Sequence, residues 1–291
     1  MEPILLKPTI KNLLWGSEQW GISAHQNGDN EVLNKEFEGV SLSELFKNHP
    51  ELFGNISLAQ FPLLTKIINA NTDLSIQVHP DDEYAFKNEN GSLGKTECWY
   101  IIDAKQDATI VIGHNAKNKE ELQFMINNGK WNDFIREVPV HKGDFFFIEP
   151  GTVHAIKGGT KILETQQSSD ITYRVYDYDR LQNGKPRQLH VKQSLDVIKS
   201  PFIQKEPPLN KDISIGDVTQ LVSCNLFTVW HGVVKDKLLI NQNRPFLLCS
   251  VIGGLCKIGS HSFEKGNHFI LPYNYGSAEF NGEAELIFSS I

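Results

Sequence analysis

The sequence predicts an all-β dominated fold of two jelly-roll β-barrel units with a few short helical insertions. Apolar runs of roughly four to eight residues, rich in Ile, Val, Phe and Tyr, alternate with clusters of Gly, Asn, Asp and Pro, a pattern typical of short strands joined by turns. One strand-and-turn pattern also occurs twice, at Lys142–Pro150 and at Lys265–Pro272. Two such copies favour paired Greek keys that enclose a cavity for a metal and a small ligand. A chance similarity of two Lys-Gly turns is the alternative interpretation.

The strands of the first unit are predicted from runs enriched in β-branched and aromatic residues. They are Leu74–Val78, Cys98–Ile102, Thr109–Ile112, Asp144–Ile148 and Ile171–Tyr178.

Helices are expected only as insertions into this β framework. Ser41 and Glu44 have the spacing of a capping box, which predicts a short helix after Ser41. Asn118 and Glu121 repeat that spacing and predict a second helical segment that ends near Gly129.

A linker is predicted at residues 201–212, where three prolines lie among polar residues and no apolar periodicity is left. We therefore expect an N-terminal domain at 1–200, which carries the metal site and a helical insertion at about 118–135. The C-terminal domain at 213–291 is predicted to lack a metal, because its copy of the repeat has no histidine after the turn.

The bulk composition describes an ordinary globular protein of 291 residues, 40% of them hydrophobic, which is enough for a sizeable core. The formal net charge is −7 and no stretch is dense in Lys or Arg, so a nucleic-acid binder is not expected. A phosphorylated substrate would need a locally basic pocket.

The cysteines and the N-terminus predict a cytoplasmic protein. Cys98, Cys224, Cys249 and Cys256 form neither a CxxC pair nor an evenly spaced framework, so reduced thiols are expected. The first eight residues lack the basic start and apolar run of a signal peptide, and no window predicts a membrane span.

Two histidines and a carboxylate on separate predicted strands indicate an open divalent-metal centre. Residues two apart on a strand point the same way, so Gln77 shares a face with His79, and Lys95 shares one with Glu97. His154 follows a Pro-Gly turn suited to aiming a strand inward.

Zinc suits these ligand types, and three or four protein ligands leave a position for water or substrate. The Gln77 amide oxygen is a plausible fourth ligand. A lone histidine is more often a surface or hydrogen-bonded residue, and that interpretation holds for the rest, with His141 and His268 expected to be exposed. The remaining histidines are His25, His49, His114, His190, His231 and His261.

A second polar set runs from Glu164 to Arg180. Its second half alternates with period two, which predicts one cavity-facing side suited to an anionic, hydroxylated ligand. A solvated outer face of an edge strand is the alternative. The residues of that face are Thr172, Arg174, Tyr176, Tyr178 and Arg180.

These segments resemble, in order, those of the type I mannose-6-phosphate isomerases, zinc-dependent enzymes of the cupin superfamily, in their short bacterial form. The matching motifs cover most of residues 15 to 180, and several carry residue types with a chemical role. They are Glu18-x-Trp20-x-Ile22-Ser23-x-His25, Phe61–Lys66, Leu74–Asp81, Gly94–Tyr100, Pro150–Ala155 and Ser169–Val175.

The resemblance implies a role for individual residues. Gln77, His79, Glu97 and His154 correspond to the ligands of one Zn²⁺ per chain, and Arg174 to the catalytic arginine. Lys95 and Glu164 correspond to proton-handling positions. The positions near the substrate phosphate correspond to Ser75, Lys66 and Arg180. The larger helical domain of long family members is absent, and only Asn118–Ile135 stands in its place.

The implied reaction interconverts mannose 6-phosphate and fructose 6-phosphate through a cis-enediolate. Either Lys95 or Glu164 can be the general base, and the sequence does not decide between them. Two alternatives remain: a cupin Fe(II) oxygenase, because His79, Glu97 and His154 also satisfy a facial triad, and a non-catalytic metal- and sugar-binding cupin. Gln77 and the basic residues disfavour the oxygenase. A monomer or a homodimer is expected, with no membrane or nucleic-acid partner.

Overall fold

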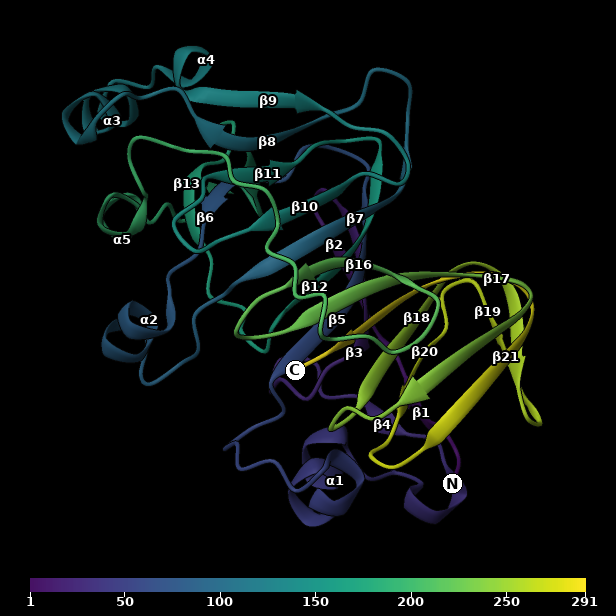
Figure 1. Cartoon of the computed structure of the whole chain (residues 1–291). Coiled ribbons are helices and arrows are strands. Elements are labelled where there is room, and N and C mark those ends of the chain that lie inside the picture. Colours follow the sequence, from purple (N-terminus) through teal and green to yellow (C-terminus); the bar gives the residue numbers. More distant parts are fainter. The chain divides into compact units, whose positions relative to one another are not determined.

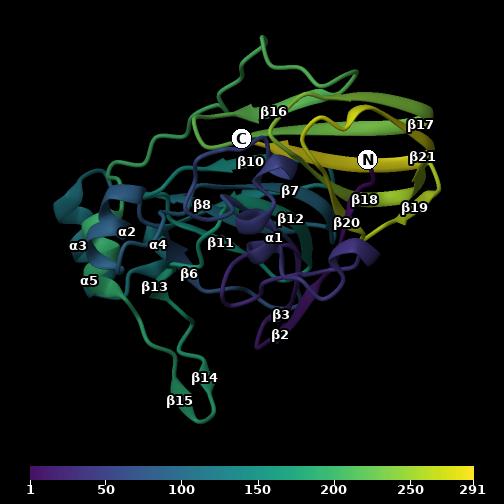
Figure 2. The ribbon, with the colours of Figure 1, turned by 90° about the horizontal axis from the view of Figure 1, so that it is seen from below.

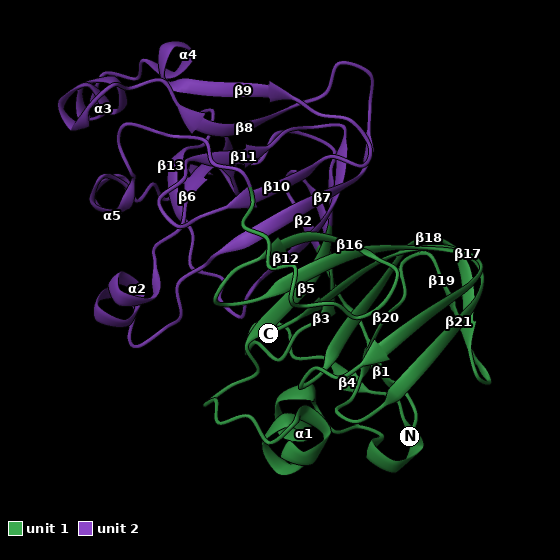
Figure 3. Cartoon of the chain, in the orientation of Figure 1, with its two compact units in different colours: residues 1–11, 19–67, 207–291 green, residues 12–18, 68–206 purple.

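The computed structural model describes residues 1–291, which form two compact units (Figure 3). Unit 1 combines residues 1–11, 19–67 and 207–291, and unit 2 combines residues 12–18 and 68–206. The divisions fall inside three strands, β2 (Thr9–Leu13), β3 (Gly16–Ile22) and β5 (Leu63–Ala70).

Unit 1 is built around one antiparallel sheet with the strand order β16-β17-β21-β18-β20-β1-β4, and β19 pairs with β18 (Figure 1). The long strands β17 and β21 pair along their whole length of 15 residues. The strands are β1 (Ile4–Lys7), β4 (Glu31–Val32), β16 (Thr219–Ser223), β17 (Thr228–Gln242), β18 (Leu247–Ile258), β19 (His261–Glu264), β20 (His268–Leu271) and β21 (Gly276–Ser290).

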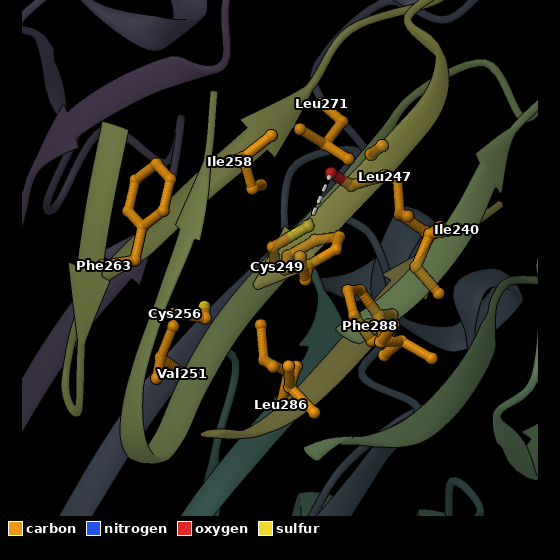
Figure 4. Packing of buried hydrophobic residues seen from close by; sticks show 14 of the residues in the cluster. Ile240, Leu247, Cys249, Val251, Cys256, Ile258, Phe263, Leu271, Leu286 and Phe288 are labelled. Carbon is orange, nitrogen blue, oxygen red and sulfur yellow. Dashed lines mark hydrogen bonds between the residues drawn. The ribbon is translucent and has the colours of Figure 1, made fainter. Parts of the chain in front are cut away.

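Alternating side chains of this sheet form a dry core (Figure 4). Ile240, Leu247 and Phe288 meet there from β17, β18 and β21, and all three are fully buried. Such period-two burial is what the alternating sequence pattern predicts for strands with one covered face.

The helices of unit 1 are short: η1 (Lys35–Phe37), α1 (Leu42–Asn48) and η2 (Pro50–Phe53). The predicted capping box of α1 is confirmed, because Ser41 Oγ accepts a hydrogen bond from the Glu44 amide at 3.3 Å and the Glu44 carboxylate accepts one from the Ser41 amide at 3.2 Å.

Unit 2 contains two sheet regions that pack face to face. One has the order β13-β6-β11-β8-β9, and the other places β7 between β10 and β12. Trp99 and Ile101 of β7 pack in one core with Ile110 and Ile112 of β8. The strands are β6 (Ile76–Val78), β7 (Glu97–Ala104), β8 (Thr109–His114), β9 (Ile135–Pro139), β10 (Phe145–Ile148), β11 (His154–Ile156), β12 (Thr160–Gln167), β13 (Tyr173–Tyr176), β14 (Leu181–Gln182) and β15 (Lys185–Pro186).

The helices of unit 2 are α2 (Asp82–Asn88), α3 (Lys119–Asn127), α4 (Trp131–Phe134) and α5 (Val191–Val197). Asn118 caps α3 by accepting from the Glu121 amide at 2.8 Å, as predicted. Together α3 and α4 make up the helical insertion expected between the second and third metal segments.

The internal repeat has the same backbone in both copies. Gly143 and Gly266 each have φ +93°, a left-handed value that favours glycine. The next side chain, Asp144 in one copy and Asn267 in the other, accepts a hydrogen bond from the amide three residues before it. A strand then follows in each copy, β10 or β20, which supports the prediction of a repeated unit over that of two chance turns.

The compact units do not coincide with the predicted domains 1–200 and 213–291. The physical reason is strand pairing: β1 lies beside β20, with Ile4 opposite Ile270 and Leu5 opposite Phe269, so the N-terminal residues fold with the C-terminal sheet. The linker and the domain intervals stay a prediction.

The strand predicted at Ile171–Tyr178 is shorter in the structure. β13 covers Tyr173–Tyr176, its register shifts between Arg174 and Tyr176, and Tyr178 and Asp179 both have φ +54°. The left-handed backbone turns the chain toward the hairpin of β14 and β15, so the single face from Thr172 to Arg180 that period two predicted does not form.

All four cysteines are free, as expected. None of the helices has the length and apolar character that crossing a membrane requires. The cytoplasmic location stays a prediction.

Candidate active site

Three buried side chains of unit 2 converge on one point. His79 Nε2 lies 3.3 Å from one Glu97 oxygen, His154 Nε2 lies 3.4 Å from the other, and the two Nε2 atoms are 3.1 Å apart. All three residues are at most 1% exposed. Ligand atoms of a tetrahedral zinc site, at zinc–nitrogen distances of about 2.0–2.1 Å, are separated from each other by roughly 3.3 Å, so the spacing fits a zinc ion.

Strand register brings these residues together. His154 of β11 lies opposite Gln77 of β6, and Gln77 lies opposite Arg174 of β13, so the three side chains share one level and one face. Glu97 starts β7 in the facing sheet region. The amide of Gly151 donates to the carbonyl of His79 at 2.9 Å, which ties the turn before His154 to the first histidine.

The outer nitrogens of both imidazoles are fixed by backbone carbonyls. His79 Nδ1 lies 2.7 Å from the Ile171 carbonyl, and His154 Nδ1 lies 2.8 Å from the Thr152 carbonyl. Because a carbonyl only accepts, each Nδ1 carries the proton and each Nε2 turns a lone pair toward the other. A carbonyl that orients a ligating histidine in this way is typical of metal sites.

Electrostatics at the centre also fit a cation. Burial lowers the pKa of His79 to about 3 and lowers that of His154, so both rings are neutral near pH 7. Burial alone would raise the pKa of Glu97, but Lys95 and the two histidines hold it well below its usual value. Neither buried Glu97 oxygen makes a hydrogen bond of good geometry, which leaves a carboxylate suited to a metal.

Gln77 completes the shape of a four-ligand site. Its amide nitrogen is placed 3.3 Å from His154 Nε2. Turning the amide over exchanges its oxygen and nitrogen, which puts the oxygen where a fourth ligand is needed.

Lys95 and Glu164 lie beside the centre, both buried. Lys95 Nζ is 2.9 Å from Glu97 Oε2, 3.2 Å from His79 Nε2 and 3.5 Å from Glu164 Oε1. The other Glu164 oxygen accepts from the indole of Trp99 at 3.0 Å, and Trp99 lies opposite Glu164 in the pairing of β7 with β12. Both candidate proton carriers thus lie directly beside the cluster of His79, Glu97 and His154.

Arg174 lies opposite Gln77 in the pairing of β13 with β6. Its Nη1 donates to the Gln188 carbonyl at 2.8 Å, and its backbone amide donates to His190 Nδ1 at 3.1 Å. Its buried Nε has no hydrogen-bond partner. Partial burial and then the nearby Arg187 lower the pKa of Arg174.

Family comparisons agree with this constellation. Residues 5–102 match the model of the phosphomannose isomerase type I catalytic domain, and residues 217–291 match that of the mannose-6-phosphate isomerase cupin domain. Mannose-6-phosphate isomerase ManA of Bacillus subtilis is 46% identical over an alignment that covers 100% of this chain and 99% of the relative. The chain belongs to the type I mannose-6-phosphate isomerase family. It is therefore an isomerase.

Other mannose-6-phosphate isomerases are similar along their whole length. The Streptococcus mutans enzyme is 44% identical, with 99% of this chain and 98% of the relative covered. A crystal structure of the mannose 6-phosphate isomerase from Bacillus subtilis has a TM-score of 0.94 at 40% identity, with complete coverage of both chains. A putative mannosephosphate isomerase from Archaeoglobus fulgidus shares the fold, with a TM-score of 0.79 at 18% identity. The match covers 100% of this chain and 98% of the other.

The predicted phosphate residues of this mannose-6-phosphate isomerase family member differ in their surroundings. Ser75 is buried directly before β6 in unit 2. Arg180 lies after β13 and bonds Asp177 and the Asp73 carbonyl. Lys66 belongs to β5 in unit 1, with its ammonium 5.9 Å from the Trp20 ring centroid. Their contacts with substrate stay predictions.

Sequence reasoning missed three polar side chains. Asp177 and Arg187 form a bidentate ion pair near Arg174. The sequence did not predict this pair, because Arg187 lies in a polar turn segment that matches no motif. His268 was expected to be exposed and is instead 6% exposed, with its Nδ1 2.8 Å from Ser250 Oγ. It opens strand β20 and is buried on the sheet face opposite that of Phe269, with its ring next to Gly21, whereas His141 is exposed as predicted.

Proposed function

We propose that the chain interconverts mannose 6-phosphate and fructose 6-phosphate through a cis-enediolate, with one Zn²⁺ held by His79, Glu97, His154 and Gln77. The observation that carries the proposal is the pair of imidazole lone pairs that face each other at 3.1 Å beside the buried, ionised Glu97 carboxylate, which is ion-paired with Lys95. Because both rings carry their proton on Nδ1, neither Nε2 has a proton to donate to the other, and two imidazoles with a carboxylate are a ligand set that suits a divalent metal.

The bound zinc supplies Lewis-acid stabilisation of the negative charge that develops on the substrate oxygens. Arg174 contributes a second, fixed positive charge on the same face as Gln77 and His154. A cation held in place before the reaction begins does not have to reorganise when the charge develops, which makes such a group effective in a partly buried site.

Glu164 is the general base of the proposal. Its carboxylate can take the proton from C2 and return it to C1, whereas the ion-paired ammonium of Lys95 has no lone pair with which to accept a proton. The Trp99 indole fixes one Glu164 oxygen and leaves the other toward Lys95, which orients the carboxylate for transfer.

The substrate phosphate needs contacts with positively charged or hydroxyl-bearing side chains. Arg180, Ser75 and Lys66 are its candidate contacts, as the family resemblance implies. A carboxylate base near the metal and a cationic phosphate site suit a sugar phosphate better than they suit a dioxygen-using iron centre.

Glu97→Gln tests the metal centre. The substitution keeps the size of the side chain but removes the charge, so we expect the zinc content to fall well below one per chain and isomerisation to be lost. The measurements are metal analysis of the purified protein and a coupled assay of mannose 6-phosphate conversion. His141→Ala, at an exposed histidine, is the matched control and should keep both its zinc content and its isomerisation activity. Full activity in Glu97→Gln would refute the assigned centre.

A further inference from the structure

Three arginines of unit 2 gather around a single carboxylate. Asp177 is 4% exposed and receives Arg187 through Nε at 2.7 Å and Nη2 at 2.5 Å. Arg180 Nη2 reaches the same Asp177 oxygen at 2.5 Å. Arg174 is the third guanidinium, close enough for Arg187, Asp177 and Arg180 all to act on its pKa.

The charges of this cluster do not balance. Three guanidinium groups and one carboxylate leave two positive charges in a partly buried place. Burial would raise the pKa of Asp177, but Arg187 and Arg180 hold it below its usual value, so the carboxylate is ionised near neutral pH. The excess of two positive charges matches a phosphate dianion.

The guanidinium of Arg187 is oriented but only partly engaged. Its Nε and Nη2 bind Asp177, which leaves the Nη1 edge without a protein partner. Arg180 differs, because its Nε and Nη2 bind Asp177 and its Nη1 binds the Asp73 carbonyl. Arg187 therefore has more donors left for a ligand than Arg180 has.

The position of the cluster suits the far end of a hexose 6-phosphate. Arg174 lies opposite Gln77, a candidate metal ligand, whereas Arg180 binds the carbonyl of Asp73, four residues earlier on the same segment. At about 3.3 Å per extended residue this is a separation of at most about 13 Å. The arginine cluster and the metal centre therefore adjoin one segment of unit 2, the arrangement expected for a sugar phosphate held at both of its ends.

The two outer arginines also flank a hairpin. Arg180 precedes β14 and Arg187 follows β15, and Asn183 and Gly184 form the turn with φ +54° and +78°. Figure 2 shows this hairpin extending away from β6 and β13. Asp177 thus holds both ends of the hairpin and sets the direction of both guanidinium groups.

We propose that Arg187 is a further phosphate-binding residue for the substrate, and that Asp177 is the positioning residue that orients Arg187 and Arg180 toward it. The inference rests on the proposed function, because it assigns the phosphate of that substrate. It adds a residue that the family-like motifs of the sequence did not contain.

Arg187→Ala and Arg187→Lys test the proposal. We expect Arg187→Ala to raise the KM for mannose 6-phosphate at least tenfold while kcat changes by less than threefold and zinc content stays normal. The inhibition constant of inorganic phosphate should rise in parallel, and Arg187→Lys should recover part of both losses. Lys185→Ala removes an exposed cation from the same hairpin and should change neither constant.

A purely structural role of Arg187 predicts a different result. In that case Arg187→Ala would lower the thermal midpoint, and KM and the phosphate inhibition constant would stay at their wild-type values, which would overturn the proposal. Protection of the wild-type protein against thermal unfolding by inorganic phosphate, lost in Arg187→Ala, is measured without turnover. If the wild type shows this protection but no isomerisation, the proposed function fails while the anion site stands.

Discussion

Each imidazole of the candidate metal centre is held at two points, by its own backbone and by a carbonyl on its Nδ1. The carbonyls of Ile171 and Thr152 come from loops that precede β13 and β11, so the ring orientation depends on local backbone rather than on the metal. A site oriented in this way before metal arrives loses little entropy on binding.

Arg174→Ala should separate charge stabilisation from metal binding. Arg174 makes no contact with His79, Glu97 or His154, so we expect a normal zinc content. Turnover should fall at least a hundredfold, about 3 kcal/mol of transition-state stabilisation. Steady-state assays with metal analysis measure both quantities.

The control for this variant is Arg136→Ala, which removes a guanidinium that bonds the Ile112 carbonyl and Gln204 instead. Turnover of Arg174→Ala within threefold of wild type, at normal zinc content, would contradict the assigned role.

At this scale strand parity predicted that Gln77 shares a face with His79 and Lys95 with Glu97, and the structure does bring His79, Glu97 and His154 together. Their role as metal ligands stays a prediction. The sequence could not predict the Asp177–Arg187 pair, because ten residues and a hairpin separate the two side chains along the chain. The burial of His268 could not be predicted either. A histidine at the start of a strand, next to a turn, has no sequence pattern that shows which side chains will surround it.

Among the elements, α1 is a short helix whose first turn depends on its cap. Ser41 and Glu44 satisfy one another's backbone amides, and Leu42, Leu45 and Phe46 bury the inner face. The amides of Leu42 and Ser43 bind the Asn30 carbonyl and Asp29, so truncation of Ser41 leaves only the Glu44 amide without its acceptor.

Ser41→Ala should therefore lower the free energy of unfolding by about 1 kcal/mol, as loss of an N-cap does elsewhere. Urea titration of the purified protein measures the change. Ser262→Ala, at an exposed position of β19, is the control and should stay within about 0.5 kcal/mol. A loss in Ser41→Ala no larger than that of the control would show that the cap does not stabilise the helix.

Element existence was easier to predict than element ends. Both capped helices and all five predicted strands of the first unit occur, but β13 is four residues long where period two predicted eight. Alternation of polar residues continues past Tyr176, and only the left-handed backbone at Tyr178 and Asp179 shows that the strand has ended.

In the whole molecule, each unit has a core of its own. Phe288 is fully buried in unit 1 and packs edge-on against Phe280 with ring centroids 5.5 Å apart. The candidate metal ligands, in contrast, all belong to unit 2. The two-unit division differs from the predicted domains because pairing of β1 with β20 joins distant parts of the chain, which local composition cannot reveal.

Phe288→Ala should lower stability without removing the metal. Loss of a buried aromatic ring costs about 3–5 kcal/mol through lost burial and the cavity left behind. We expect a lower thermal midpoint with the zinc content unchanged at temperatures where the protein stays folded. Phe86→Ala, at a phenylalanine that is 71% exposed, should change neither the thermal midpoint nor the zinc content. If the folded Phe288→Ala protein lost its zinc, the core of unit 1 and the metal centre of unit 2 would not be independent, which would contradict this prediction.

We propose that a zinc ion held by His79, Glu97, His154 and Gln77 supports isomerisation of mannose 6-phosphate. The most direct measurement is a coupled assay of fructose 6-phosphate formation on the purified protein, run as prepared, after complete chelation, and after zinc is restored. We predict activity as prepared, its loss on chelation and its return with zinc at one ion per chain. Activity that persists after the metal has been removed, or that is absent in every metal state, would contradict the account.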